Sequence, residues 1–120
     1  MTDAPRTALE FVAWLVARHP GLAPLLDECL RDNGELLPHV LFGDVTRYAS
    51  TLARRRELDD LNRLLDDMDG ALDDSDDEVD NLISVSFVEN AQGVAGDDET
   101  ELRRQIRRHQ NLARQLSHYE

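Results

Sequence analysis

Residues 36–53 read LLPHVLFGDVTRYASTLA, and their apolar side chains recur every three or four positions. This spacing gives an α-helix one continuous apolar face. The face consists of Leu37, Val40, Leu41, Val45, Tyr48, Ala49 and Leu52. Gly43 lies inside this helix, where glycine costs about 1 kcal/mol relative to alanine. We therefore expect another helix to cross closely at Gly43.

The same spacing predicts a helix near the N-terminus. Thr2 or Asp3 is its expected cap, Pro5 lies in its first turn, and residues 19–21, His-Pro-Gly, end it. Its apolar face consists of Ala8, Phe11, Val12, Leu15 and Val16. Further helices are predicted over residues 22–32, 55–72 and 101–118.

The segment of residues 78–92 fits two patterns. Ile83, Val85 and Phe87 alternate with serines as in a strand, whereas the apolar residues from Val79 onward also fit a helix face. We predict a helix, because the sequence offers no second strand for pairing. The expected fold is all-α: one domain over residues 1–120, forming a compact bundle of about five or six helices in which helix pairs could stack.

Two loops interrupt this predicted bundle. Residues 73–77 read as an acidic loop. Residues 91–100 form a loop before the Arg-rich C-terminal helix, residues 101–118.

The charge of the chain is strongly acidic and unevenly distributed. Its 120 residues include 25 acidic and 13 basic side chains, for a net charge of −12. Residues 57–80 alone contain twelve acids and a single arginine, Arg63. Such a field repels nucleic acid and anionic membranes and attracts basic partners. We therefore expect a basic protein partner, with no direct binding to nucleic acid or membrane.

Cysteine content and hydropathy bear on the compartment. The single cysteine, Cys29, lies in an apolar pattern and is expected to be a small buried hydrophobe. The first residues lack the pattern of a signal peptide, and no apolar run is long enough to span a bilayer. The expected location is the cytoplasm.

Catalytic and metal-binding motifs are not apparent in the sequence. The four histidines, at positions 19, 39, 109 and 118, show no spacing typical of a zinc site or a catalytic group. Residues 66–70, DDMDG, resemble part of a calcium loop, but Leu65 stands where that loop requires an acid. We therefore predict a protein that is not an enzyme and uses no metal or cofactor.

Two interpretations of the acidic run stay open. It is either a solvated face that keeps the protein soluble or a docking surface for a basic partner. Like charges at this density destabilise the compact state, and a neutralising partner would relieve that cost. The acids of residues 57–72 are expected on the outer side of their helix. The candidate partner-binding residues are Asp66, Asp67, Asp69, Asp73, Asp74, Asp76, Asp77 and Asp80.

A basic stripe follows in the C-terminal helix. It consists of Arg103, Arg104, Arg107, Arg108 and Arg114. These arginines are too few to outweigh the acidic field and to indicate nucleic-acid binding. They could instead fold back on the acidic segment.

Two blocks of sequence carry a family resemblance. Residues 35–48, ELLPHVLFGDVTRY, and residues 81–90, NLISVSFVEN, resemble those of a family of small bacterial helical proteins of unknown function. The similar region spans residues 11–90 and leaves the Arg-rich tail outside. In size, charge and architecture such proteins resemble the small acidic immunity proteins that neutralise secreted toxins.

These observations together predict an acidic binding protein that neutralises a basic partner. The most specific form is an immunity protein that blocks a cognate bacterial toxin such as a nuclease, with carboxylates pairing with the basic groups of the toxin's groove. The alternative is a structural or regulatory module that self-associates through its C-terminal helix, forming a homo-oligomer. An enzyme is the third hypothesis.

Overall fold

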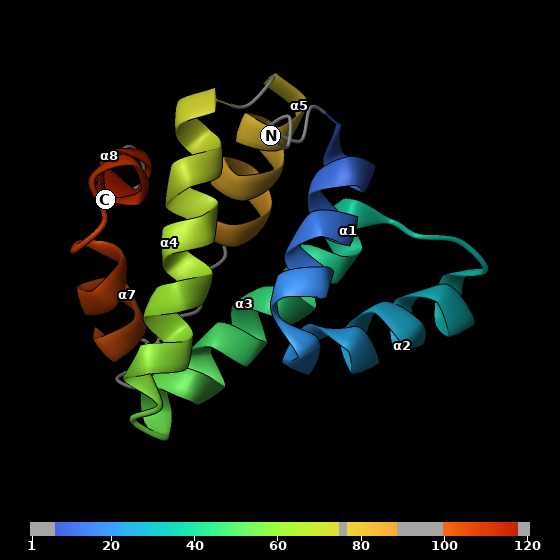
Figure 1. The fold of residues 1–120 in the computed structure, drawn as a ribbon, viewed down its shortest axis with the longest axis horizontal. Coiled ribbons are helices and arrows are strands. Elements are labelled where there is room, and N and C mark those ends of the chain that lie inside the picture. The colour runs from blue at the N-terminus through green and yellow to red at the C-terminus, as the bar shows by residue number, and fades with distance from the viewer. Residues whose placement is uncertain (1–6, 75–76, 89–99, 118–120) are drawn as a thin grey trace.

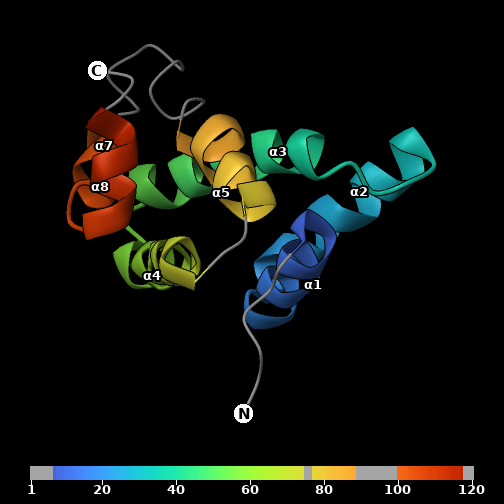
Figure 2. The same ribbon diagram turned by 90° about the horizontal axis from the view of Figure 1, so that it is seen from above.

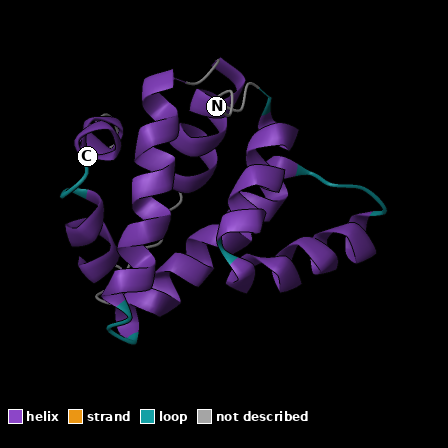
Figure 3. Cartoon of the chain, in the orientation of Figure 1, coloured by secondary structure: helices purple, strands orange, loops and turns teal. Residues whose placement is uncertain are grey.

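The computed structural model describes residues 7–74, 77–88 and 100–117, and it confirms the all-α fold. Figure 3 shows helices joined by loops, with no strand in the described part of the chain. In Figure 1 the elements run from α1 in blue to α8 in red. Their bounds are α1 Ala8–Arg18, η1 Pro20–Leu22, α2 Ala23–Asn33, α3 Pro38–Arg54, α4 Leu58–Asp74, α5 Asp77–Ile83, η2 Ser84–Val88, α7 Thr100–Ile106 and α8 Gln110–Ser117.

Helix α3 is the centre of the arrangement. It contacts α1, α2, α4, α5, η2 and α7. Figure 2 shows α4 and α1 on one side of α3 and α5, with α7 and α8 at one end and α2 reaching out at the other. Helix α4 lies between α1 and the α7–α8 pair in Figure 1. Both flanks of α4 therefore have neighbours.

The core is built from aliphatic side chains around three phenylalanines. Phe11, Phe42 and Phe87 are fully buried, and the ring centres of Phe11 and Phe42 are 5.9 Å apart. Cys29 is buried and Trp14 is half-buried. The predicted burial of Cys29 is therefore confirmed.

The start of α1 differs from the prediction. Thr7 is the N-cap, and its hydroxyl accepts a hydrogen bond from the Glu10 amide while the Glu10 carboxylate accepts one from the Thr7 amide, both at 3.1 Å. This capping box satisfies amides that the helix itself cannot. Thr2 and Asp3, the expected caps, precede the described residues, and the structure assigns the cap to Thr7 instead.

The acidic loop predicted for residues 73–77 is largely helix. Helix α4 continues to Asp74 and α5 begins at Asp77. The prediction was wrong because Asp has only a modestly poor helix propensity, and packing of an amphipathic face overrides it. Only residues 75–76 separate the two helices, and these two lie outside the described residues.

The ambiguous segment is helical as far as it is described. Helix α5 continues into η2, a π-helix that buries Ser86, Phe87 and Val88. A π-turn adds a residue to the helical repeat. The alternation of Ile83, Val85 and Phe87 does not match burial, because Val85 is 40% exposed whereas Ile83 and Phe87 are buried.

The predicted C-terminal helix, residues 101–118, is two helices. After α7 the chain tightens, as the amides of Arg108 and His109 donate to the carbonyls of Gln105 and Ile106, three residues earlier. Helix α8 then begins at Gln110. Apolar spacing alone did not reveal this break, because it continues in phase from Ile106 to Leu116.

The close approach expected at Gly43 occurs at Gly21 instead. A Cβ atom added at Gly43 would meet nothing within 4 Å. At Gly21 the added atom would lie 2.2 Å from the Tyr48 hydroxyl oxygen. The absence of a side chain at Gly21 therefore lets η1 pack against Tyr48 of α3.

Arg56 shapes the turn between α3 and α4. Its φ of 61° is left-handed, which is unusual for a residue other than glycine. The Glu57 amide donates to Leu52 and the Arg56 amide to Ala53. These two bonds form a Schellman motif that ends α3.

Candidate partner-binding surface on α4

A groove of about 660 Å³ runs beside α4. We call it the α4 groove. Residues from the end of α1, from η1, from α3 and from α4 line it: Arg18, His19, Pro20, Gly21, Tyr48, Asp60, Arg63, Leu64, Asp66 and Asp67. It therefore joins charged side chains of α4 to an aromatic ring that lies far away in sequence.

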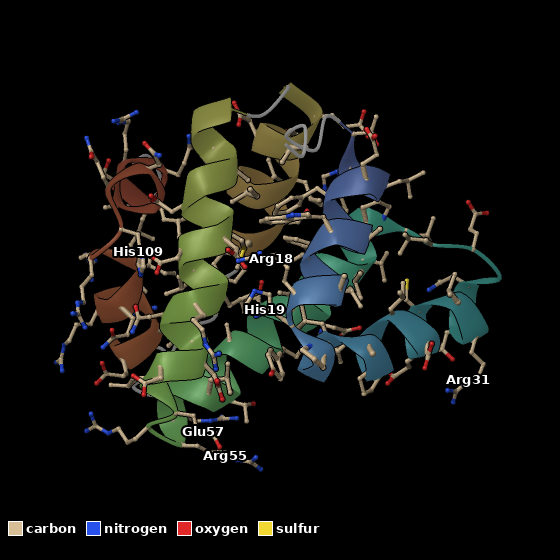
Figure 4. All side chains as sticks on the ribbon, in the orientation of Figure 1. Arg18, His19, Arg31, Arg55, Glu57 and His109 are labelled. Carbon is tan, nitrogen blue, oxygen red and sulfur yellow. The ribbon has the colours of Figure 1, made fainter. Side chains whose placement is uncertain are left out.

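Asp67, a predicted partner-binding residue, is paired with other side chains of the same molecule. Its carboxylate accepts hydrogen bonds from Nε and Nη2 of Arg18 at 2.8 and 3.1 Å, and lies 2.6 Å from Nε2 of His19. These hydrogen bonds and the charge of Asp67 raise the pKa of Arg18. Figure 4 shows Arg18 and His19 between α1 and α4. Asp67 therefore joins the two helices.

Arg18 has a second contact that fixes its guanidinium. The group lies 5.0 Å from the centre of the Trp14 ring, within the range of a cation–π interaction. Arg18 is thus engaged by both Asp67 and Trp14.

Tyr48 lies in the part of the groove next to Gly21. Burial, followed by the charges of Asp60 and Glu57, raises the pKa of the Tyr48 phenol. The charges of Glu57, just before α4, and of Asp60, in its first turn, therefore act on this ring, and Arg18 and Arg63 also line the groove.

Asp60 and Arg63 form an ion pair at the rim of the groove. Their side chains are 54% and 72% exposed, and a pair this open stabilises a protein by about 1 kcal/mol or less. A smaller hollow of about 380 Å³ continues from here along the start of α4. It is lined by Arg56, Glu57, Leu58, Asp59, Asp60 and Arg63.

Asp66 is more exposed than Asp67, Asp69 and Asp80. Its side chain is 71% exposed, and its carboxylate lies 3.0 Å from Nδ1 of His109. Nε2 of His109 lies 2.9 Å from the side-chain oxygen of Asn62. His109, on the far side of α4 from His19 (Figure 4), therefore helps to hold the α7–α8 turn.

Asp69 does not lie on the outer face, contrary to expectation. Its Oδ1 accepts hydrogen bonds from the amides of Asn111 and Leu112 at 2.8 and 2.9 Å. These amides belong to the first turn of α8, where no intrahelical acceptor exists. Asp69 therefore caps α8 from a different helix, and we remove it from the candidate binding surface.

The other candidates lie at the junction of α4 and α5. Asp73 and Asp74 are in the last turn of α4, Asp77 is the first residue of α5, and Asp80 is half-buried on α5. Asp76 lies outside the described residues. Another acid of α5, Glu78, accepts a hydrogen bond from the Ala8 amide at 2.8 Å. Part of this acidic junction is therefore used to hold α1.

The arginines of the C-terminal segment have partners within it. Arg104 lies 3.3 Å from Glu101, and Arg108 donates to Gln105 at 3.1 Å. The pKa of Glu101 is lowered, mainly by the hydrogen bond from the Gln105 side chain and also by the charges of Arg104 and Arg56. Helix α8 packs on α4, where Asp69 accepts hydrogen bonds from the amides of Asn111 and Leu112, and His109 of the preceding turn lies against Asp66.

The two sequence blocks that suggested a family meet in space. Nδ1 of His39 is hydrogen-bonded to Oγ of Ser86, and the Thr46 hydroxyl donates to the Ser86 carbonyl at 3.3 Å. His39 thus joins α3 to η2. His118 lies outside the described residues.

The described residues contain neither a metal-binding cluster nor a membrane-spanning helix. No group of three or more His, Cys, Asp or Glu side chains that could hold a metal ion occurs there. No helix among them is both long and apolar enough to cross a membrane.

The fold and this surface define an all-α protein with an acidic, grooved face on α4. The chain belongs to the family described as a domain of unknown function, DUF7674, whose model matches residues 12–113. The family therefore extends over the arginines of α7 and into α8, beyond the region of resemblance expected from the two blocks. No curated protein and no solved structure matches the chain.

Proposed function

We propose that this protein binds a basic protein partner through the exposed acids of α4. The observation that carries the proposal is the concentration of twelve acids and one arginine in residues 57–80. Asp67, Asp69 and Glu78 have structural partners. Glu57, Asp59 and Asp66 are exposed and lie along or just before the N-terminal half of α4.

The partner class follows from charge complementarity. A negative face raises the rate of encounter with a positive one and disfavours anionic competitors. A toxin with a basic substrate groove, such as a nuclease, is the most specific partner of this kind, because carboxylates can take the place of phosphates against arginine and lysine. An immunity role in the cytoplasm is thus the finer form of the proposal, supported by size, charge and architecture.

The rival hypothesis of self-association through the C-terminal helices has less support. Leu102, Ile106, Leu112 and Leu116 are fully buried within the chain. The apolar face that would join two copies is therefore already covered by α3, α4 and η2.

The test begins with capture of the partner from the native host, using the purified protein as bait. Association and dissociation rates are then measured at several salt concentrations. The triple variant Glu57→Gln, Asp59→Asn, Asp66→Asn should associate more slowly and with a weaker salt dependence. The fourfold variant with Asn at positions 73, 74, 76 and 77 tests the α4–α5 junction in the same way.

The matched control removes the same charge from α2. Asp27, Glu28 and Asp32 are exposed, and their conversion to Asn, Gln and Asn also removes three negative charges. A general effect of net charge would slow both variants equally. Equal association rates for the α4 and α2 variants would reject α4 as the binding face.

A further inference from the structure

The α4 groove has a composition that selects for one kind of side chain. Three carboxylates, of Asp60, Asp66 and Asp67, and two guanidinium groups, of Arg18 and Arg63, line it. Asp67 is engaged by Arg18, which also lies over Trp14. Asp60 is paired with Arg63 and Asp66 lies 3.0 Å from His109, but both carboxylates are more than half exposed, so an incoming ligand can reach them and the ring of Tyr48.

We propose that the α4 groove receives an arginine side chain of the basic partner, with its guanidinium paired to Asp60 and lying against Tyr48. This inference rests on the proposed function, because it assumes a basic protein partner. It adds the site and the residue type that such a partner presents.

Arg63 of the chain itself already makes the kind of contact proposed for the partner's arginine. Its guanidinium pairs with Asp60 at the rim of the groove, and its side chain is 72% exposed. A weak surface pair can be exchanged at little cost for a pair that is less exposed to solvent. An arginine from the partner can thus take the place of Arg63 on Asp60.

The charge of the groove favours a cation over an anion. Burial is the first cause that raises the pKa of Tyr48, and the charges of Asp60 and Glu57 raise it further, so two negative groups act on the ring. An anion would also have to approach three carboxylates. Among cations, arginine suits the site better than lysine, because its planar group stacks on aromatic rings and forms paired hydrogen bonds with a carboxylate.

The groove also has room for such a side chain. Its volume is about 660 Å³, and in the described part of the chain no hydrogen bond of the Tyr48 hydroxyl is found. The hydroxyl oxygen can therefore accept a bond from an incoming N–H group.

The experiment titrates the isolated full-length protein with N-acetyl-arginine amide and follows backbone amide shifts by NMR. N-acetyl-citrulline amide is the matched neutral probe, and inorganic phosphate is the anionic one. The arginine probe should shift the amides of Gly21, Tyr48 and Asp60 and should bind more tightly than citrulline. Asp60→Asn should weaken its binding roughly twofold to fivefold, the effect of one exposed ion pair.

Arg63→Ala provides the sharpest arm of this experiment. If Arg63 competes with the probe for Asp60, its removal should strengthen arginine binding. Arg31→Ala on α2 removes the same charge away from the groove, so it is the control for a nonspecific effect of net charge. Tyr48→Leu should weaken binding more than Tyr48→Phe, because only Leu removes the ring. Amide spectra of each variant verify that the fold is retained.

Three results would overturn the inference: equal shifts with arginine and citrulline, phosphate binding in the groove, or no effect of Asp60→Asn and Arg63→Ala. None of these results bears on the partner kinetics of the triple α4 variant. If the triple variant associates slowly with the partner but the groove does not bind arginine, this inference is rejected and the proposed function stands.

Discussion

Replacing Asp69 by Ala removes the acceptor that holds the first turn of α8 against α4. Two amide bonds to its Oδ1, at 2.8 and 2.9 Å, are lost. Loss of a helix cap costs about 0.5–2 kcal/mol, and loss of the charge near the helix N-terminus costs about 0.3–1 kcal/mol. We expect Asp69→Ala to lower the free energy of unfolding by about 2 kcal/mol.

Two variants separate the causes of this loss. Asp69→Asn keeps an oxygen acceptor but removes the charge, so it should cost about half as much as Asp69→Ala. Asp66→Ala, one turn earlier on the same helix, removes an acid that is 71% exposed. It should cost about 0.5 kcal/mol, as for exposed ion pairs.

Urea denaturation followed by far-ultraviolet circular dichroism measures these differences. For a chain of this size, 2 kcal/mol corresponds to a decrease in Tm of roughly 6–12 °C. Amide exchange at Asn111 and Leu112 shows whether α8 opens locally before the rest unfolds. Equal stability of Asp69→Ala and Asp66→Ala, with unchanged exchange at these amides, would refute the capping role.

Four further substitutions test the packing and the turn at Arg56. Phe87→Ala should cost about 3–5 kcal/mol in urea denaturation, because the ring is fully buried; an unchanged midpoint would place it on the surface. Gly43→Ala should stabilise by about 0.5–1 kcal/mol, whereas Gly21→Ala should destabilise by about 1–3 kcal/mol because Tyr48 must move; the same sign for both would contradict the contacts. Arg56→Gly should raise Tm slightly, by relieving a left-handed backbone that costs about 1 kcal/mol, and a lower Tm would mean that the ion pair with Glu101 outweighs the strain.

Apolar spacing was sufficient to predict the helices but not their ends. Helix α3 begins at Pro38 and buries most of the face expected of it, but Val40 is 50% exposed. The start of α1 was available in the sequence, since Thr7 and Glu10 have the spacing of a capping box. The break between α7 and α8 was not, because it depends on Asp69, which belongs to another helix.

The candidate site could be predicted only as a region. Helical geometry placed all the aspartates of α4 on its polar side, but it does not say which flanks of α4 have neighbours. The structure places α1 on the Asp67 side and α8 on the Asp69 side. The groove could not be predicted from the sequence either, because Gly21, Tyr48 and Asp60 come together only through the tertiary packing of η1, α3 and α4.

The acidic run therefore contains two kinds of residue: acids with structural partners and acids without an ion pair. Like charges on one helix repel each other, and part of that cost is offset where Asp69 and Glu78 meet the amide-rich starts of α8 and α1. Among the described residues, Glu57 and Asp59 have no ion pair that offsets their charge in this way. These two acids lie in the hollow that shares Asp60 with the α4 groove, where Arg56 and Arg63 are the cations that the chain itself supplies. Under the proposed function, the start of α4, rather than the whole acidic run, is where we expect a basic partner to bind.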